Sequence, residues 1–284
     1  MAYWDWPCAA GSACSQVVIC VHGLSRQGRD FDVLAQALAP RSRVIAVDVA
    51  GRGHSDWLAD PMAYQVGTYA ADLLSLMSHV RSEMPEAVID WVGTSMGGLI
   101  GLAVAAQPAF APRRLVLNDV GPVIQWAALK RIGTYLGKNP SFDSEQQAVA
   151  YLTSISMGFG PHSAEQWLAL SRPMLRERAG RWWLHYDPAI AVPFQVLSGG
   201  ADPVAAEKAV QAGEAALWGL YDTITAATLL LRGADSDLLT RETANAMAGR
   251  GPRAQCVEFA GVGHAPTLVT PDQVTVVRDF LWVP

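Results

Sequence analysis

Short apolar runs alternate with segments of helical spacing along the first part of the chain. The runs lack polar alternation, which is typical of parallel strands buried on both faces, and they cover residues 17–21, 43–48, 88–92 and 114–118. Between them, apolar residues recur at helical spacing over residues 31–39, 66–84 and 98–106. Strand and helix in this rhythm predict an α/β fold with a mostly parallel, doubly wound sheet.

The pattern changes after Gly121-Pro122. Up to about residue 225 it favours helices only, near residues 123–137, 144–157, 163–178, 204–216 and 217–224. The strand pattern returns at residues 228–232 and 255–259, and a final helix is expected over residues 271–282. We therefore expect a sheet core made of residues 1–121 and 226–284, with residues 122–225 inserted as a helical cap.

Composition and charge narrow the range of partners. Of the 284 residues, 51% are hydrophobic and 17% are charged, which is enough apolar material for a large core and excludes a disordered chain. The formal net charge is -5, and nucleic acids and anionic membranes both favour clustered basic residues instead. We expect no nucleic-acid or membrane partner, only a small-molecule substrate; the oligomeric state stays open.

The lack of a targeting signal and the pattern of the cysteines both favour a cytoplasmic protein. No apolar run reaches the roughly 18 residues that a membrane span needs, and the first residues lack the basic and apolar regions of a secretory signal. The four cysteines, Cys8, Cys14, Cys20 and Cys256, have no metal-ligand spacing, and the last two lie in predicted buried strands. We expect a cytoplasmic protein with free thiols.

A serine between small residues follows the third strand. The segment Gly93-Thr94-Ser95-Met96-Gly97 links that strand to an apolar helix. A nucleophilic serine on such a sharp turn needs small neighbours, because its backbone is strained and other segments pack closely on both sides. Ser95 is therefore the predicted nucleophile of a serine hydrolase.

A serine hydroxyl is a weak nucleophile and needs a base to accept its proton. His264 follows the last predicted strand in Gly261-Val-Gly-His264-Ala-Pro, where a loop at the carboxyl edge of the sheet can reach the serine. The other five histidines fall in turns, on helices or in the cap, where a buried or surface histidine without a catalytic role is expected. His264 is therefore the predicted base.

The acid that orients this base is sought in the loop after residues 228–232. That loop carries Asp235 and Asp237, and Asp237 is preferred because Leu238 and Leu239 after it would anchor the loop and bury the carboxylate. Asp119, at the end of the fourth strand, is a third possible acid, although its neighbours suggest that it shapes the start of the cap. The choice among the three stays open, with Asp237 favoured.

Two backbone N–H groups are needed to stabilise the oxyanion of a tetrahedral intermediate. Met96, at the start of the helix after Ser95, and Leu24, just after His22-Gly23, are the expected donors. No ligand cluster or phosphate-binding loop is present, so neither a metal nor an organic cofactor is expected.

These motifs together resemble the α/β-hydrolase superfamily. The strand ending in His22-Gly23, the segment Asp48-x-x-Gly51-x-Gly53-x-Ser55, the Ser95 turn, the Asp-containing loop and Gly263-His264 occur in the order of that family, from about residue 17 to residue 282. The resemblance implies a Ser-His-Asp triad and a cap that varies between members. A serine at position 95 disfavours the branches that use an aspartate there.

The leading hypothesis for function is carboxylesterase-like hydrolysis of small apolar or aromatic carboxylic esters through an acyl-enzyme. It is favoured by a cap rich in aromatic residues, namely Trp126, Tyr135, Tyr151, Phe159, Trp167, Trp182, Trp183, Tyr186, Phe194 and Trp218, which would exclude water from the triad. Most of these side chains are expected to form the core of the cap itself. The alternatives are a C–C bond hydrolase of a dienoic or β-diketone compound, and a non-catalytic receptor for a small ligand.

Overall fold

A central sheet organises the computed structural model, which describes residues 1–9, 14–198 and 203–283. Within these residues the sheet has seven strands in the order β1-β3-β2-β4-β5-β9-β10. Only β1 runs antiparallel to its neighbour, and the other pairings are parallel. The strands are β1 (Ala2–Trp6), β2 (Gln16–Val21), β3 (Arg43–Asp48), β4 (Val88–Thr94), β5 (Arg114–Asn118), β9 (Ala227–Gly233) and β10 (Gln255–Phe259). This is the mostly parallel α/β sheet that the apolar runs predict.

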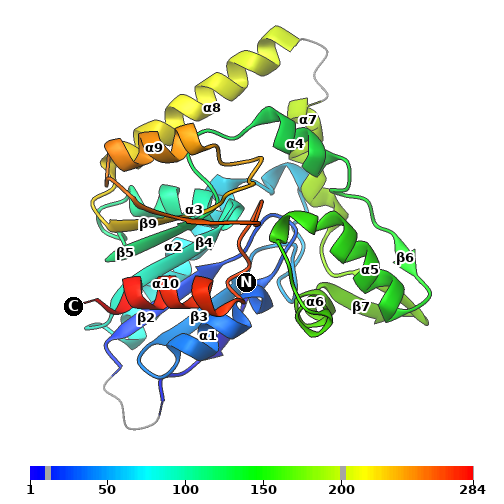
Figure 1. Ribbon diagram of the computed structural model, residues 1–284, viewed down its shortest axis with the longest axis horizontal. Helices are drawn as coiled ribbons and strands as arrows, with labels where there is room; N and C mark the ends of the chain where they lie inside the picture. The colour runs from blue at the N-terminus through cyan, green and yellow to red at the C-terminus, as the bar shows by residue number, and fades with distance from the viewer. Residues whose placement is uncertain (10–13, 199–202, 284) are drawn as a thin grey trace.

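Helices cover both faces of the sheet (Figure 1). One face packs on α1 (Asp32–Leu38) and α10 (Pro271–Trp282), which contact each other, and the other packs on α2 (Val66–Glu83) and α3 (Met96–Ala105). Successive strand residues alternate between the two cores: Val18 and Cys20 face the α1 and α10 side, whereas Val17 and Ile19 face the α2 and α3 side. Burial on both faces explains why the strands are continuously apolar.

The predicted strands of the sheet are confirmed with small changes at their ends, and one strand was missed. β1 alternates between half-buried and exposed residues, so its short edge pattern gives no buried apolar run. At the other edge, β10 is mostly exposed, and the expectation that Cys256 is buried is wrong. An edge strand lacks a neighbour on one side, which leaves its side chains more accessible.

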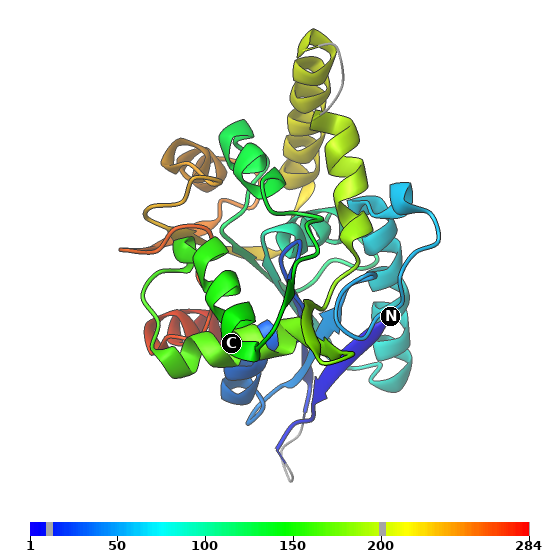
Figure 2. The ribbon, with the colours of Figure 1, turned by 90° about the vertical axis from the view of Figure 1, so that its right-hand side faces the viewer.

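The segment 122–225 contains both helices and strands, so the expectation of helices alone is wrong. A small antiparallel sheet joins β6 (Ser141–Phe142), β8 (Arg181–Leu184) and β7 (Leu175–Arg178). It lies with α5 and α6 beside the carboxyl edge of the main sheet (Figures 1 and 2). The helices are α4 (Trp126–Gly133), α5 (Glu145–Ile155), α6 (Ala164–Ser171), α7 (Val192–Ser198) and α8 (Pro203–Thr223); residues 199–202 of the expected cap lie outside the described residues.

The last helix of this segment differs from the prediction in two ways. Residues 203–223 form the single helix α8, not two helices. α8 also packs against α3, and its Tyr221 is fully buried and donates a hydrogen bond to the carbonyl of Met247 on α9 (Arg241–Gly249). The C-terminal part of α8 is thus joined to the layer that covers the sheet.

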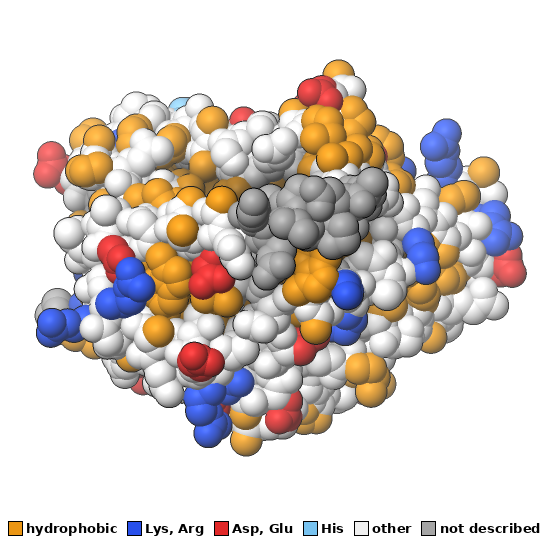
Figure 3. Space-filling view, turned by 90° about the horizontal axis from the view of Figure 1, so that it is seen from above, with side chains coloured by type: hydrophobic (Ala, Val, Ile, Leu, Met, Phe, Trp, Pro, Cys, Tyr) orange, Lys and Arg blue, Asp and Glu red, His pale blue; other side chains and the backbone are white. Residues whose placement is uncertain are grey.

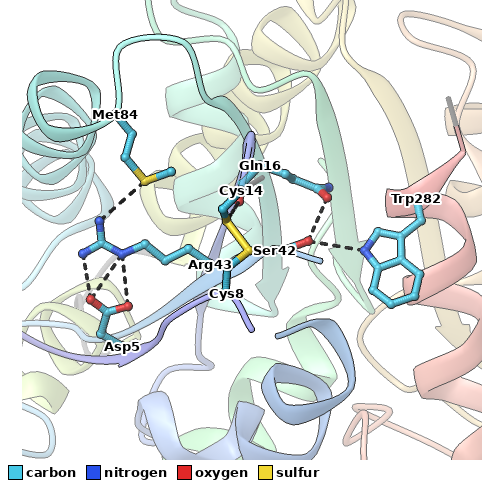
Figure 4. The surroundings of a disulfide bond; sticks show 8 residues. All are labelled: Asp5, Cys8, Cys14, Gln16, Ser42, Arg43, Met84 and Trp282. Carbon is cyan, nitrogen blue, oxygen red and sulfur yellow. Dashed lines mark hydrogen bonds and ion pairs between the residues drawn. A yellow bond between two sulfur atoms is a disulfide. The ribbon is translucent and has the colours of Figure 1, made fainter. Parts of the chain in front are cut away.

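Two of the four cysteines form a disulfide near the N-terminus. Cys8 and Cys14 are bonded, whereas Cys20 and Cys256 are free, so the expectation of free thiols is wrong for the first pair. The bond lies close to Arg43, which pairs with Asp5 of β1 (Figure 4). Disulfides are uncommon in the cytoplasm, so this bond gives no support to a cytoplasmic location, which stays a prediction.

Over the described residues, no helix is both long and apolar enough to cross a membrane. On the face seen from above, basic and acidic side chains are interspersed with hydrophobic ones (Figure 3). Charges of both signs also meet where Arg241 of α9 and Arg232 of β9 pair with Glu258 of β10.

Candidate active site

Ser95 lies on the sharp turn between β4 and α3. Its backbone has φ 52° and ψ -116°, a conformation that non-glycine residues adopt only under strain. A Cβ on Gly97 would lie 1.9 Å from the carbonyl oxygen of Val21, and one on Gly93 would lie 2.3 Å from the carbonyl oxygen of Gly97. The neighbours of Ser95 must therefore be small, as the motif predicts.

The imidazole of His264 faces Ser95 from the loop after β10. Its Nε2 lies 2.9 Å from Ser95 Oγ, and its side chain is only 12% exposed. Two hydrogen bonds hold this loop: the N–H of Gly263 donates to the carbonyl of Gly158 at 2.7 Å, and Asn118 Nδ2 donates to the carbonyl of Pro266 at 2.8 Å. The structure thus brings the predicted nucleophile and the predicted base together.

Asp119 is the carboxylate that meets His264. Its Oδ2 lies 2.7 Å from His264 Nδ1, and the side chain is fully buried. Two further donors reach this carboxylate: the N–H of Gly233 at 2.9 Å and the hydroxyl of Ser236 at 2.6 Å. Since a carboxylate only accepts hydrogen bonds, Nδ1 carries the proton and Nε2 is left as an acceptor for the Ser95 hydroxyl.

Asp237 lies elsewhere, and the expectation that it orients His264 is wrong. Its carboxylate is 43% exposed and accepts hydrogen bonds from Arg131 Nε and Nη2 at 2.6 and 2.8 Å. Burial by itself raises the pKa of Asp237, but the hydrogen bonds and charge of Arg131 outweigh it, and that pKa is lowered. Leu238 and Leu239 are buried as expected, yet the Asp237 carboxylate binds Arg131 of α4 and not His264. Asp235 is exposed as well.

The two expected oxyanion donors both belong to residues beside Ser95. Leu24 lines the same cavity as Ser95, and Arg52 fixes its peptide by donating from Nε to the Leu24 carbonyl at 2.8 Å. Met96 is the first residue of α3, where backbone N–H groups have no partner within the helix. Their role toward an oxyanion stays a prediction.

His22 shapes the turn that precedes Leu24. Burial lowers the pKa of His22 to about 3, against a smaller raising effect of the Gly23 carbonyl. The neutral ring accepts a hydrogen bond from the Val49 N–H at Nε2, so Nδ1 carries the proton and donates to the Gly23 carbonyl at 2.7 Å. His22 is therefore a fixed structural support of this turn, in keeping with the prediction for it.

A cavity of about 100 Å³ opens over Ser95 and His264 between the sheet edge and the segment 122–225. The segment contributes a mostly apolar wall, and four of its ten aromatic residues singled out above take part: Tyr135, Tyr151, Phe159 and Tyr186. The charged lining groups are Arg26, Asp30 and Arg131. Among the described residues, no group of three His, Cys, Asp or Glu side chains is arranged to hold a metal.

Comparison with known proteins shows the family of this chain. Residues 18–276 match the model of the alpha/beta hydrolase family. The chain belongs to this family. The central sheet, the strand order and the flanking helices of this α/β hydrolase agree with that assignment.

Relatives of this hydrolase carry names of ester-cleaving enzymes. It is 44% identical over 284 residues to a 3-hydroxybutyrate-oligomer hydrolase of Cupriavidus necator, with 99% of this chain and 92% of the relative covered. It is 26% identical over 266 residues to a pimeloyl-[acyl-carrier protein] methyl ester esterase of Xanthomonas campestris, covering 90% and 91% of the two chains. An alpha/beta hydrolase from Novosphingobium aromaticivorans has a similar solved structure, with a TM-score of 0.81, 32% identity and coverage of 98% and 92%.

The sequence offers a signal for Asp119 that was given too little weight. Asp119 follows β5 directly, at the edge of the sheet where Ser95 also lies, and it is preceded by the polar Asn118 at the end of an apolar strand. Its φ of 56° turns the chain there. A polar pair at a strand end indicates a site at that edge. The burial and the hydrogen-bond partners that separate Asp119 from Asp235 and Asp237 depend on tertiary contacts, which sequence spacing does not reveal.

Proposed function

We propose that this hydrolase cleaves carboxylic esters with Ser95 as nucleophile, His264 as base and Asp119 as the acid that orients the base. The observation that carries the proposal is the unbroken chain of hydrogen bonds from Ser95 Oγ through His264 to Asp119. This arrangement has the order of groups that activates a serine in triad hydrolases. The ester-cleaving names of the relatives support the same chemistry.

The first half of the reaction makes an acyl-enzyme. His264 Nε2 accepts the proton of the Ser95 hydroxyl as Oγ attacks the ester carbonyl carbon, and Asp119 stabilises the imidazolium that forms. The backbone N–H groups of Leu24 and Met96 hold the oxyanion of the tetrahedral intermediate. When that intermediate collapses, the C–O bond to the alcohol breaks and His264 returns the proton to the leaving oxygen.

The second half regenerates the serine. Water takes the place of the alcohol and gives a proton to His264 Nε2 while its oxygen attacks the acyl carbon. Collapse of this second intermediate releases the carboxylic acid and returns the proton to Ser95 Oγ. The whole cycle uses groups of this chain and consumes one water molecule, in the second half.

The proposed substrates are esters of short hydroxy acids, with oligomers of 3-hydroxybutyrate as the first to test. The relative that is 44% identical carries that substrate in its name, and the cavity of about 100 Å³ is small beside the several hundred Å³ of pockets for large ligands. A short acyl unit suits this space better than a bulky aryl group. This refines the earlier expectation of small apolar or aromatic esters.

A screen with p-nitrophenyl esters of graded acyl length tests the reaction class. We expect the highest kcat/KM at two to four acyl carbons or so, because the cavity is small. A fluorophosphonate probe should label Ser95, as mass spectrometry of the peptide that contains it will show. A folded protein that neither turns over these esters nor takes up the label would contradict the proposal and favour a non-catalytic receptor.

Replacement of the nucleophile is the sharpest mutational test. Ser95→Ala should lower ester turnover by at least about 10⁴-fold, because the acyl-enzyme can no longer form, while the melting temperature stays close to that of the wild type. Ser75→Ala is the matched control, since Ser75 lies exposed on α2 and bonds only the Ala71 carbonyl in its own helix. It should keep full activity. Near wild-type turnover by Ser95→Ala would refute the mechanism.

A further inference from the structure

Two arginines line the cavity, and their ion-pair partners lie in different places. Arg26 and Asp30 both line it and form an ion pair with each other at 2.6 Å. Arg131 also lines the cavity, but its partner Asp237 does not. Among the described lining residues, Arg131 is therefore the charged group whose ion-pair partner is not itself part of the lining, so a ligand in the cavity would meet the guanidinium of this pair and not the carboxylate.

The guanidinium of Arg131 retains donors for a second acceptor. Asp237 takes one N–H from Nε and one from Nη2, and Tyr135 forms a further hydrogen bond with this guanidinium. An arginine has five N–H donors in all, so two of them are left for a ligand. Asp237 also fixes the plane of the guanidinium by binding it at two points, which prepares it for a planar ligand such as a carboxylate. The side chain is 40% exposed and also lines the cavity, so a ligand can reach it.

We propose that Arg131 binds the free carboxylate of the substrate and so selects esters whose alcohol half carries an acid group. This rests on the proposed esterase function. In an ester of 3-hydroxybutyrate, one CH and one CH₂ separate the ester oxygen from the carboxylate. An ester carbonyl held at Ser95 thus places the carboxylate of its alcohol half only a few atoms away, within the cavity that Ser95 and Arg131 both line.

The position of Arg131 relative to Ser95 determines which ester bond of an oligomer is cut. An oligomer of a hydroxy acid has a single free carboxylate, at one end of the chain. If that carboxylate binds Arg131, the ester bond nearest to it lies at Ser95, and the first product is one hydroxy acid monomer. Cleavage should therefore proceed from the carboxyl end, one unit at a time.

A matched pair of substrates tests the inference. The linear dimer of 3-hydroxybutyrate and its methyl ester share the same internal ester, but only the dimer has a free carboxylate. For Arg131→Gln we expect kcat/KM on the dimer to fall at least about tenfold, because a charge-assisted pair is lost. The same variant should change hydrolysis of the internal ester in the methylated dimer less than about twofold. Liquid chromatography separates the products.

Two control variants separate binding from general effects. Arg172→Gln removes another arginine of the segment 122–225, which pairs with Glu145 on the surface, and it should affect neither substrate. The double variant Arg131→Gln/Asp237→Asn also removes the carboxylate that the single variant leaves without a partner. It should keep the tenfold loss on the dimer; recovery to the wild-type value would show that repulsion by Asp237 caused the loss, and would overturn the inference.

Inhibition gives a second readout that does not depend on turnover of the dimer. With p-nitrophenyl butyrate as the neutral substrate, 3-hydroxybutyrate should inhibit competitively, and its inhibition constant should rise about tenfold in Arg131→Gln. The role of Arg131 would be refuted if Arg131→Gln lowered kcat/KM equally on the dimer and on its methyl ester, or left the inhibition constant unchanged, while the neutral ester is still cleaved. Failure of the wild type on the neutral ester would instead refute the esterase proposal.

Discussion

The loops that follow β5 and β9 leave the same edge of the sheet, and each carries an aspartate close to the active site. Asp119 comes directly after β5, is fully buried and accepts hydrogen bonds from a backbone N–H, a serine and His264. Asp237 lies further along its loop, is half exposed and pairs with Arg131. The comparison shows that burial and a full set of donors distinguish Asp119, the carboxylate that binds His264. Gly233 at the end of β9 and Ser236 in the loop after it both donate to this carboxylate.

The largest expected effect comes from Asp119→Asn. An amide in this position can no longer hold Nδ1–H as a carboxylate does, so His264 loses the tautomer that accepts the serine proton. We expect kcat on a neutral ester to fall by about 10⁴-fold. Steady-state kinetics with p-nitrophenyl butyrate will measure it, with circular dichroism as the check on folding. A larger loss in Asp237→Asn would reverse the two assignments.

Removal of a donor from the buried carboxylate should have an intermediate effect. Ser236 donates to Asp119 at 2.6 Å and accepts from the N–H groups of Leu238 and Leu239. Ser236→Ala leaves Asp119 with two partners and loosens the loop, so we expect kcat to fall about tenfold, the equivalent of roughly 1.4 kcal/mol. Ser236→Thr should recover part of the activity, because it keeps a hydroxyl. A wild-type kcat for Ser236→Ala would show that this donor is dispensable.

On neutral esters, Asp237→Asn should have only a small effect on catalysis. Its carboxylate does not bind His264, so kcat/KM for p-nitrophenyl butyrate should change less than about threefold, as expected for a charge outside the reacting groups. The same assay used for Asp119→Asn allows a direct comparison. A loss above a hundredfold would mean that the charge of Asp237 acts on His264 in the reaction.

The smallest expected effect is on stability. Because Arg131 lowers the pKa of Asp237 in the folded protein, their pairing adds stability above the unfolded pKa of about 3.9 and loses it as the pH falls through the lower folded value. The pair is half exposed, so Asp237→Asn should lower the free energy of unfolding at pH 7 by less than about 1 kcal/mol. Urea unfolding should show a smaller difference from the wild type near pH 3. A difference that grows on acidification would contradict this sign.

Much of the fold could be predicted from the sequence, because strands that are buried on both faces of the sheet appear in the sequence as continuous apolar runs. The strands β2 to β5 are continuous apolar runs, and the turn at Ser95 is bounded by glycines. The pair of Ser95 and His264 followed from their positions after strands. These features depend on local sequence and on the order of elements.

The remaining features depend on contacts between distant segments. β7 and β8 are short and lie in a segment with helical spacing, and they form a sheet only by pairing with each other and with β6. The preference for Asp237 was wrong for a similar reason, because the Asp237 carboxylate binds Arg131 on α4, in the segment 122–225.

The backbone contact between Gly158 and Gly263 limits how this enzyme could be re-engineered by exchange of the segment 122–225. The loop of His264 is held by a carbonyl that belongs to this segment, and a Cβ on Gly158 would lie 3.1 Å from the carbonyl oxygen of His264. A foreign segment would have to supply an equally placed carbonyl on a residue without a side chain. Grafts that change substrate preference should therefore keep residues 158–160 and vary the helices on either side of them.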